Sequence, residues 1–165
     1  MSAHLIRNMI ETLSPPSLEH LCDLAVTIAP AVEIGQTVSG LRRMIPITGG
    51  VVRGPRLNGT VLPGGADFQL IVGGGTQAHL DARYVIEIED GTRVFVQNTA
   101  LRFASVENSM RIMRGEPVNP EAVYFRCQPR LEATGEKWGW LSESQFLGVG
   151  RRAPDGVFLS FYRVV

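Results

Sequence analysis

The chain has 165 residues, 44% of them hydrophobic, and its sixteen basic and sixteen acidic side chains give a formal charge of zero. This length and apolar content suit a domain with a buried core and exclude a largely disordered chain. The zero net charge gives no electrostatic reason to expect binding to nucleic acid or to an anionic membrane. It also does little to oppose self-association, so we expect a homo-oligomer.

The first half of the chain is predicted to form short strands joined by tight turns. Residues 1–17 are expected to be an N-terminal arm, and residues 18–165 a single domain. Apolar residues recur at every second position from Leu18 to Ile28, which is typical of a strand with one buried face. Glycine and proline are then too frequent between Pro46 and Gln69 for a helix. Further strands are predicted at residues 32–36, 41–47, 51–53, 57–62 and 66–72.

The second half of the chain contains the strongest hairpin signal and the best helix candidate. Alternating apolar and polar residues from Leu80 to Ile88 run into Asp90-Gly91, a pair that favours a two-residue hairpin turn. A helix is predicted for residues 106–114, with Ser105 as its cap and Gly115 as its stop. Strands are predicted at residues 93–103, 122–131, 138–150 and 157–165.

Many short strands at regular spacing, with one short helix, indicate an all-β sandwich or an antiparallel barrel. We favour a closed antiparallel β-barrel, because few of the strands carry the continuous apolar runs of a core that is buried on both sides. The two cysteines, Cys22 and Cys127, are interpreted as buried free thiols in a reducing compartment. The first residues lack signal-peptide features and no segment has the ~20 apolar residues of a membrane helix, so we expect a cytoplasmic protein without a membrane partner.

Several motifs together resemble the DUF3237 (UPF0311) family over residues 18–165. The resemblance implies a lipocalin-like barrel that often assembles into oligomers, and it implies little about activity. The motifs that carry it are Ile45-Pro46-Ile47-Thr48-Gly49-Gly50, Gly54-Pro55, Pro63-Gly64-Gly65-Ala66-Asp67, Asp81-Ala82-Arg83-Tyr84, Asp90-Gly91, Tyr124-Phe125-Arg126 and Trp140-Leu141.

Asp67 and Tyr84 are the catalytic candidates. Asp67 follows a glycine turn and enters a strand, where a partly desolvated carboxyl group could act as general base or acid. The alternative is an Asp that caps the turn by bonding local amides. Tyr84 shares the apolar face of its strand, so its hydroxyl could donate a hydrogen bond to a substrate oxygen, or it could be an ordinary core tyrosine.

Arginines and aromatic residues are the candidates for binding substrate. A guanidinium inside a barrel would bind a carboxylate or stabilise an enolate, and the alternative for each arginine is a surface ion pair. Only one of Arg42 and Arg43 can face inward, and we select Arg42 together with Arg126. Trp138 and Trp140 are predicted to share one face of a strand and to line an aromatic pocket with Phe68 and Tyr124, unless they fill the barrel or an oligomer interface.

No spacing of histidines or cysteines indicates a metal site, and no glycine-rich motif indicates a nucleotide site, so we expect neither a metal nor a cofactor. The leading hypothesis is a cofactor-independent lyase, isomerase or cyclase that acts on a hydrophobic or aromatic small molecule by proton transfer. A non-catalytic lipocalin-like binding protein is the alternative, and a structural oligomer with a filled barrel is a third possibility.

Overall fold

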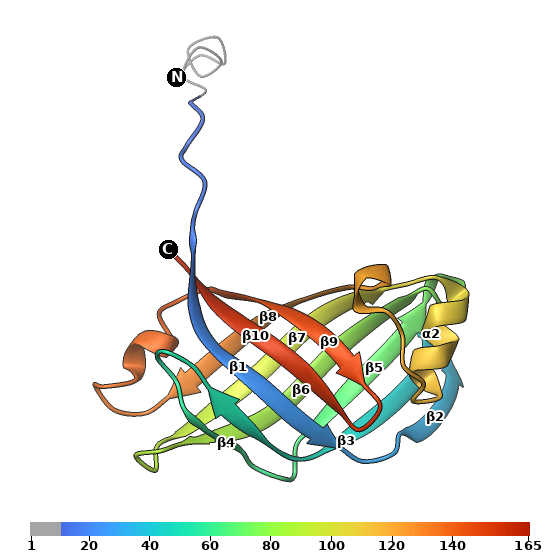
Figure 1. Cartoon of the computed structure of the whole chain (residues 1–165), viewed down its shortest axis with the longest axis horizontal. Coiled ribbons are helices and arrows are strands. Elements are labelled where there is room, and N and C mark those ends of the chain that lie inside the picture. The colour runs from blue at the N-terminus through green and yellow to red at the C-terminus, as the bar shows by residue number, and fades with distance from the viewer. Residues whose placement is uncertain (1–10) are drawn as a thin grey trace.

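The computed structural model of the protein describes residues 11–165, and the first ten residues of the predicted arm lie outside the described residues (Figure 1). Ten strands and one α-helix are present in the described part of the chain. The strands are β1 (Leu18–Ile28), β2 (Val32–Thr37), β3 (Gly40–Arg53), β4 (Gly59–Val61), β5 (Ala66–Val72), β6 (Gln77–Ile88), β7 (Arg93–Phe103), β8 (Tyr124–Ala133), β9 (Phe146–Ala153) and β10 (Gly156–Val164). The helix is α2 (Val106–Met113), and short 3-10 turns occur at η1 (Gly73–Gly75), η2 (Pro120–Ala122) and η3 (Gly139–Leu141).

The strands form one closed antiparallel barrel. Each strand pairs with its neighbours in the order β1-β10-β9-β8-β7-β6, and β6 pairs with both β4 and β5. Strands β4 and β5 also pair with β3, and β3 pairs with β1, which closes the ring. Because β1 and β2 share one edge of β3 and β4 and β5 share the other, ten strands fill eight positions. The prediction of a closed, lipocalin-like antiparallel barrel with one short helix is confirmed.

The strands predicted at residues 41–47, 51–53 and 138–150 differ most from those of the structure, and the first two are parts of the single strand β3. The glycines at positions 49 and 50 do not interrupt β3, because glycine readily adopts the positive φ angles of 153° and 157° that the strand has there. Gly50 is needed there, since a Cβ atom would lie 2.5 Å from the carbonyl oxygen of Ala25 on β1. The strand predicted for residues 138–150 begins only at Phe146, and the tryptophans before it belong to the turn η3 and its flank.

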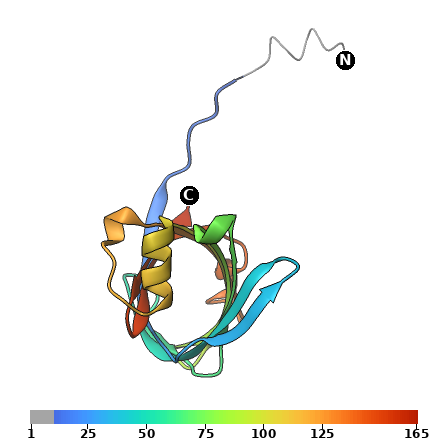
Figure 2. The same cartoon turned by 90° about the vertical axis from the view of Figure 1, so that its right-hand side faces the viewer.

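The two ends of the barrel differ. The end near η3 is filled by fully buried side chains, among them Leu57, Ile86, Leu131, Leu141 and Phe161. The helix α2 lies across the rim of the opposite end, and Figure 2 looks into the barrel from that side. The sequence signals for this helix are confirmed, because the Ser105 side chain accepts a hydrogen bond from the backbone N–H of Asn108. The barrel therefore has a packed end and an end where a cavity can open.

The described part of the arm, residues 11–17, is exposed and has no regular secondary structure. Ser17 joins the barrel through paired backbone hydrogen bonds with Val165, of 2.7 Å and 2.9 Å. Among residues 11–165, no helix is long and apolar enough to cross a membrane. The predicted oligomer and the cytoplasmic location stay predictions.

Candidate active site in the barrel cavity

The barrel contains a cavity of about 60 Å³ in the half that faces α2. Its walls are largely apolar, and Ile47, Leu80 and Leu159 are examples from three different strands. A second hollow, of about 270 Å³, lies at the rim between the C-terminal end of α2 and the β9–β10 turn. We call the two spaces the inner cavity and the rim hollow. Five residues line both, namely Ile28, Ile45, Gln69, Arg102 and Arg152.

Asp67 places a carboxyl group on the wall of the inner cavity. It is the second residue of β5, directly after the Pro63-Gly64-Gly65 turn, and the strand's alternation directs it inward together with Gln69. Its Oδ2 accepts a hydrogen bond of 2.8 Å from Nε2 of Gln69, and its Oδ1 accepts one of 3.1 Å from the backbone N–H of Asp81. Burial is the largest influence and raises the pKa of Asp67, against the opposing effect of these bonds and of Arg102. A carboxyl group with a raised pKa is a stronger base once ionised, and it can exchange a proton with a bound molecule.

Tyr84 faces the same cavity from the adjacent strand β6. Its side chain is 3% exposed, and its hydroxyl has no hydrogen-bond partner among residues 11–165. Burial raises the pKa of Tyr84 well above its ordinary value, so the hydroxyl stays protonated and can act as a donor. Two further buried oxygens that line the cavity also lack a partner within the described part of the chain, Oε1 of Gln69 and Oδ1 of Asn98. Buried polar atoms normally find partners, so three unpartnered oxygens around one cavity indicate a place for a polar ligand.

Four arginines line the rim hollow, Arg114 at the end of α2 and the three described next. Arg43 is buried, and its Nε donates to Glu33 at 2.8 Å while its Nη2 donates to the carbonyl of Met113 at the end of α2. Arg152 uses Nη1 to bond the carbonyls of Pro154 and Gly156 at 3.2 Å and 2.9 Å. Arg102 is only 5% exposed, and burial lowers its pKa to about 10. The junction of the two spaces is therefore rich in positive charge.

The predicted catalytic residues come together, and their roles stay predictions. Asp67 and Tyr84 line the same cavity. The choice of Arg42 was wrong, because the alternation of β3 directs Arg43, Ile45 and Ile47 into the barrel and leaves Arg42 on the outer face.

The prediction that Arg126 faces the pocket was also wrong. On β8 the buried positions are Phe125 and Cys127, so Arg126 between them points outward, where it stacks on Tyr124 at 5.1 Å.

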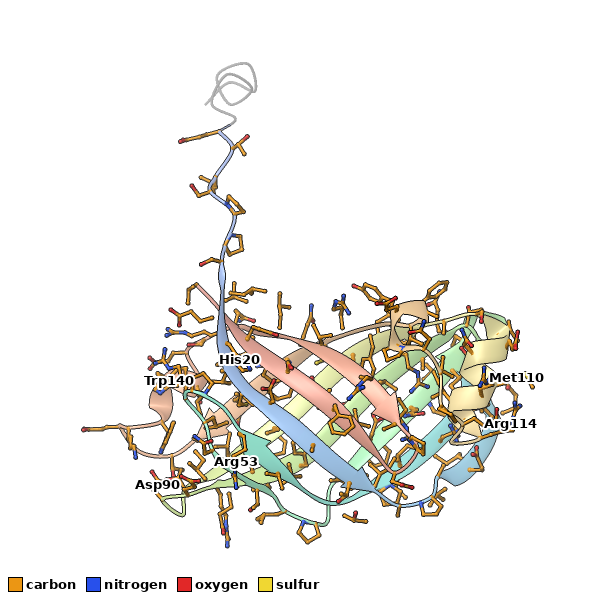
Figure 3. The ribbon with its side chains drawn as sticks, viewed as in Figure 1. His20, Arg53, Asp90, Met110, Arg114 and Trp140 are labelled. Carbon is orange, nitrogen blue, oxygen red and sulfur yellow. The ribbon has the colours of Figure 1, made fainter. Side chains whose placement is uncertain are left out.

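The predicted aromatic pocket does not form. Phe68 and Tyr124 lie on the outer face of the barrel, with 47% and 50% of their surfaces exposed. Trp138 and Trp140 lie at the packed end, far from α2, and Figure 3 shows Trp140 and Asp90 at the opposite end from Met110 and Arg114. There Nε1 of Trp138 donates to Asp90 at 2.9 Å, and Trp140 stacks against Arg56 and Arg163. These tryptophans close the barrel because they follow β8 in a turn rather than lying in a strand.

Sequence reasoning missed four residues that line the two spaces: Gln69, Asn98, Arg102 and Arg152. The signal was available for β7, where Asn98 and Arg102 occupy the same alternating phase as the buried Val94 and Val96. Polar residues at the inward-facing positions of a strand, which are otherwise apolar, indicate a cavity inside the barrel as well as a strand. Among residues 11–165, no group of three or more metal-binding side chains is present. The expectation of no cofactor stays a prediction.

Comparison with known proteins places this barrel in a family. A family model described as "Protein of unknown function (DUF3237)" matches residues 16–164. The chain belongs to the DUF3237 family. A UPF0311 protein from Rhodopseudomonas palustris is 38% identical over 152 residues, which cover 91% of this chain and 99% of that relative. The DUF3237 resemblance that the sequence motifs indicated is confirmed.

Solved structures agree with the fold. The crystal structure of a protein of unknown function from Rhodopseudomonas palustris matches with a TM-score of 0.86 and 35% identity, over 93% of this chain and all of that one. A protein from Acinetobacter baumannii, described as beta-barrel like, matches with a TM-score of 0.81 and 33% identity, over 94% of this chain and 100% of that chain. The DUF3237 barrel is thus shared with at least one protein of unknown function and with one described as beta-barrel like.

One distant relative has an assigned activity. The hydroalkoxylation enzyme phnH from Penicillium herquei is 26% identical over 151 residues, which cover 92% of this chain and 85% of that relative. The crystal structure of an enzyme from the same fungus has the same fold, with a TM-score of 0.70 and 22% identity over 95% of this chain and 100% of that one. A catalytic protein therefore exists among the relatives of this DUF3237 chain.

Proposed function

We propose that this protein is an enzyme that transfers a proton on a hydrophobic or aromatic small molecule inside the barrel, as a lyase, isomerase or cyclase without a cofactor. The observation that carries the proposal is the pairing of Asp67, whose pKa is raised, with Tyr84, whose buried hydroxyl has no partner, on one apolar cavity. The Asp67 carboxyl is bonded within the protein, to Gln69 and to the backbone of Asp81. A core tyrosine hydroxyl normally has a partner too, so the unpartnered hydroxyl of Tyr84 on the same cavity supports a site for a bound molecule.

The proposed roles follow from the two environments. Asp67, as the carboxylate, removes a proton from a hydroxyl or from an acidic C–H of the bound molecule, and its raised pKa makes it a stronger base than an ordinary aspartate. Tyr84 keeps its proton and donates a hydrogen bond to an oxygen on which negative charge develops. Because the cavity walls are apolar, both interactions act in a medium that strengthens them.

Ring closure by addition of a hydroxyl to a carbon–carbon double bond is one reaction that these groups could perform. The hydroxyl oxygen forms a bond to one alkene carbon as Asp67 takes its proton, and the other alkene carbon then receives a proton, which Asp67 can return. The π bond and the O–H bond are replaced by C–O and C–H bonds, so the product is an isomer of the substrate and nothing is oxidised. The activity named for the fungal relative supports this class of reaction.

A carrier is the second candidate. The unpartnered oxygens of Gln69 and Asn98 could orient a ligand as well as a substrate, in a barrel that is packed at one end and hollow at the other. A non-catalytic lipocalin-like protein would retain such a ligand unchanged.

The test is a reaction in D₂O with a panel of cyclic enones and hydroxyaryl alkenes, followed by mass spectrometry and proton NMR. Enzyme-dependent deuterium uptake at carbon, or formation of a cyclic isomer, is expected for the wild type and is expected to fall at least 10²-fold in Asp67→Asn. Asp23→Asn is the matched control, because Asp23 lies on the exposed face of β1, where its carboxylate bonds His20 and Ser160, and it does not line the cavity. Ligand that is bound without exchange or conversion would instead support the carrier.

A further inference from the structure

Arg102 is a buried cation without a partner at the junction of the inner cavity and the rim hollow. It is 5% exposed and lines both spaces. Within the part of the chain that the structure describes, it makes no hydrogen bond and has no carboxylate oxygen within 4 Å of its guanidinium. Taking an arginine out of water is costly unless charged or polar groups replace the lost hydration. An unpaired buried guanidinium is therefore unusual in a finished core.

The neighbouring charges do not supply the missing partner. Asp67 acts on Arg102 through space, but its two oxygens already accept hydrogen bonds from Gln69 and from the backbone N–H of Asp81. Glu33 is occupied by Arg43 at 2.8 Å, and at the rim Glu116 is occupied by Arg114 at 2.6 Å. Asp155, in the β9–β10 turn, acts on Arg152 and lines only the rim hollow. Arg43 and Arg152 instead add positive charge around Arg102.

Arg152 completes the site from β9, which is separated from the strand of Arg102, β7, by β8 alone. It lines both spaces, and only its Nη1 is used in hydrogen bonds, to the carbonyls of Pro154 and Gly156. These bonds hold the side chain in place and leave its remaining nitrogens for a ligand. Two guanidinium groups that converge on one space suit a planar anion with two oxygens, because such an anion can accept several charge-assisted hydrogen bonds at once.

We propose that Arg102 and Arg152 bind the carboxylate of an apolar monocarboxylic acid, with the carboxylate at the junction and the carbon skeleton in the inner cavity. The two arginines line both spaces, so a carboxylate bound to them lies at the junction. Asp67 and Tyr84 line only the inner cavity, so the rest of the molecule must extend into that cavity to reach them. The carbons next to the carboxylate would then lie beside the proposed base and donor. This inference names the substrate class of the proposed function and rests on it for the role of the acid as substrate.

The experiment is a calorimetric titration at fixed ionic strength with three acids, butanoate, benzoate and 3-phenylpropanoate, and with their primary amides. The amides have the same shape and lack the charge. For at least one pair, we expect the acid to bind wild-type protein tenfold or more tightly than its amide. Arg102→Met should weaken binding of that acid at least tenfold and leave the amide unchanged, because Met keeps much of the side-chain length and removes the charge. Arg42→Met, on the outer face of β3, is the matched control and should bind like the wild type.

Other outcomes would overturn the inference. Equal binding of acid and amide, no binding of any acid up to its solubility limit, or full acid affinity in Arg102→Met would each do so. If Arg102→Met does not fold, Arg152→Met tests the same site and should also lose the preference for the acid. The titration does not depend on turnover, so acid binding without any proton transfer would reject only the catalytic proposal. Turnover of neutral substrates without a preference for acids would reject only this inference.

Discussion

Oδ2 of Asp67 accepts a hydrogen bond of 2.8 Å from Nε2 of Gln69, while Oε1 of the same glutamine has no partner among the residues that the structure describes. The side-chain amide of Gln69 is thus held in one orientation by the carboxylate of Asp67. If Asp67 is replaced by asparagine, a rotation of this amide by about 180° would exchange its Nε2 and Oε1 and allow a new hydrogen bond between the two side chains. Oε1 of Gln69 would then accept from the new side-chain amide, and Oδ1 of the asparagine would keep the bond from the backbone N–H of Asp81. Asp67→Asn can therefore remove the acid–base group while keeping the hydrogen bonds that this side chain makes within the protein.

Asp67→Asn is therefore expected to keep its stability and to change its dependence on pH. The pKa of Asp67 is higher in the folded protein than its ordinary value of 3.8 in the unfolded chain. As pH rises above 3.8, the unfolded chain therefore loses this proton before the folded protein does. The wild type loses stability over this range, until pH passes the pKa of the folded state. The variant has no such loss, and its stability relative to the wild type should increase across that window. Urea denaturation between pH 4 and 8 measures the difference, and a variant that becomes relatively less stable with rising pH would contradict the pKa direction.

Tyr84→Phe should leave the fold intact and damage the activity. The hydroxyl of Tyr84 is buried and unpartnered, and an unsatisfied buried polar group costs roughly 1–3 kcal/mol, so its removal should be neutral or stabilising. If the hydroxyl donates to an oxygen of the substrate, turnover should fall about 10²-fold, as for the loss of one donor in an oxyanion site. Thermal unfolding and the deuterium-uptake assay measure the two effects separately. A marked loss of stability would mean that the hydroxyl has a structural partner.

The barrel and its inward-facing strands could be predicted from the sequence because alternation and turn residues are local signals. The strands β5 and β7 have the predicted limits, and alternation placed Asp67 and Tyr84 on inward faces. A resemblance to family motifs supplied the lipocalin-like topology that local patterns leave open. The strands and their inward faces therefore followed from information within a few residues of each position, whereas the topology did not.

The polar lining of the cavity was harder to predict. It depends on which alternate residues of each strand face inward, and on which end of the barrel is filled by side chains. The phase of β3 selects Arg43 rather than Arg42, and the neighbouring glycines obscured it. The first strand also contains a bulge between His20 and Cys22, which shifts the buried phase to include Leu21 and leaves His20 exposed. The tryptophans lie at the packed end because of long-range packing against the core, for which their spacing of two gave no signal.

Arg102→Met should raise the stability of the ligand-free protein. Below pH 10 the folded state carries the full cost of a buried guanidinium, because burial lowers the pKa of Arg102 to about 10 and the unfolded chain holds that proton more tightly. Replacing a buried charged group by an apolar one of similar length is often stabilising, here by roughly 1–4 kcal/mol. The measurement is guanidinium chloride denaturation without any carboxylate. A variant less stable than the wild type would show that Arg102 is satisfied inside the protein, and the gain should disappear in Arg102→Lys.

Gly65→Ala should disturb the site by moving the start of β5. A Cβ atom on Gly65 would lie 2.5 Å from the carbonyl oxygen of Arg83 and 2.6 Å from Cβ of Tyr84, so backbone on β5 or β6 must shift. The carbonyl of Gly65 also accepts the N–H of Ile47 at 2.8 Å, which limits how the strand can move. We expect a loss of about 1–3 kcal/mol in the free energy of unfolding, and a fall in turnover of about 10²-fold, since Asp67 follows two residues later. Gly139→Ala, where a Cβ atom meets nothing within 4 Å, is the matched control and should change neither quantity. Urea denaturation and deuterium uptake measure the two effects. If both substitutions have the same effect, the close approach of Gly65 to Tyr84 does not position the carboxyl group of Asp67.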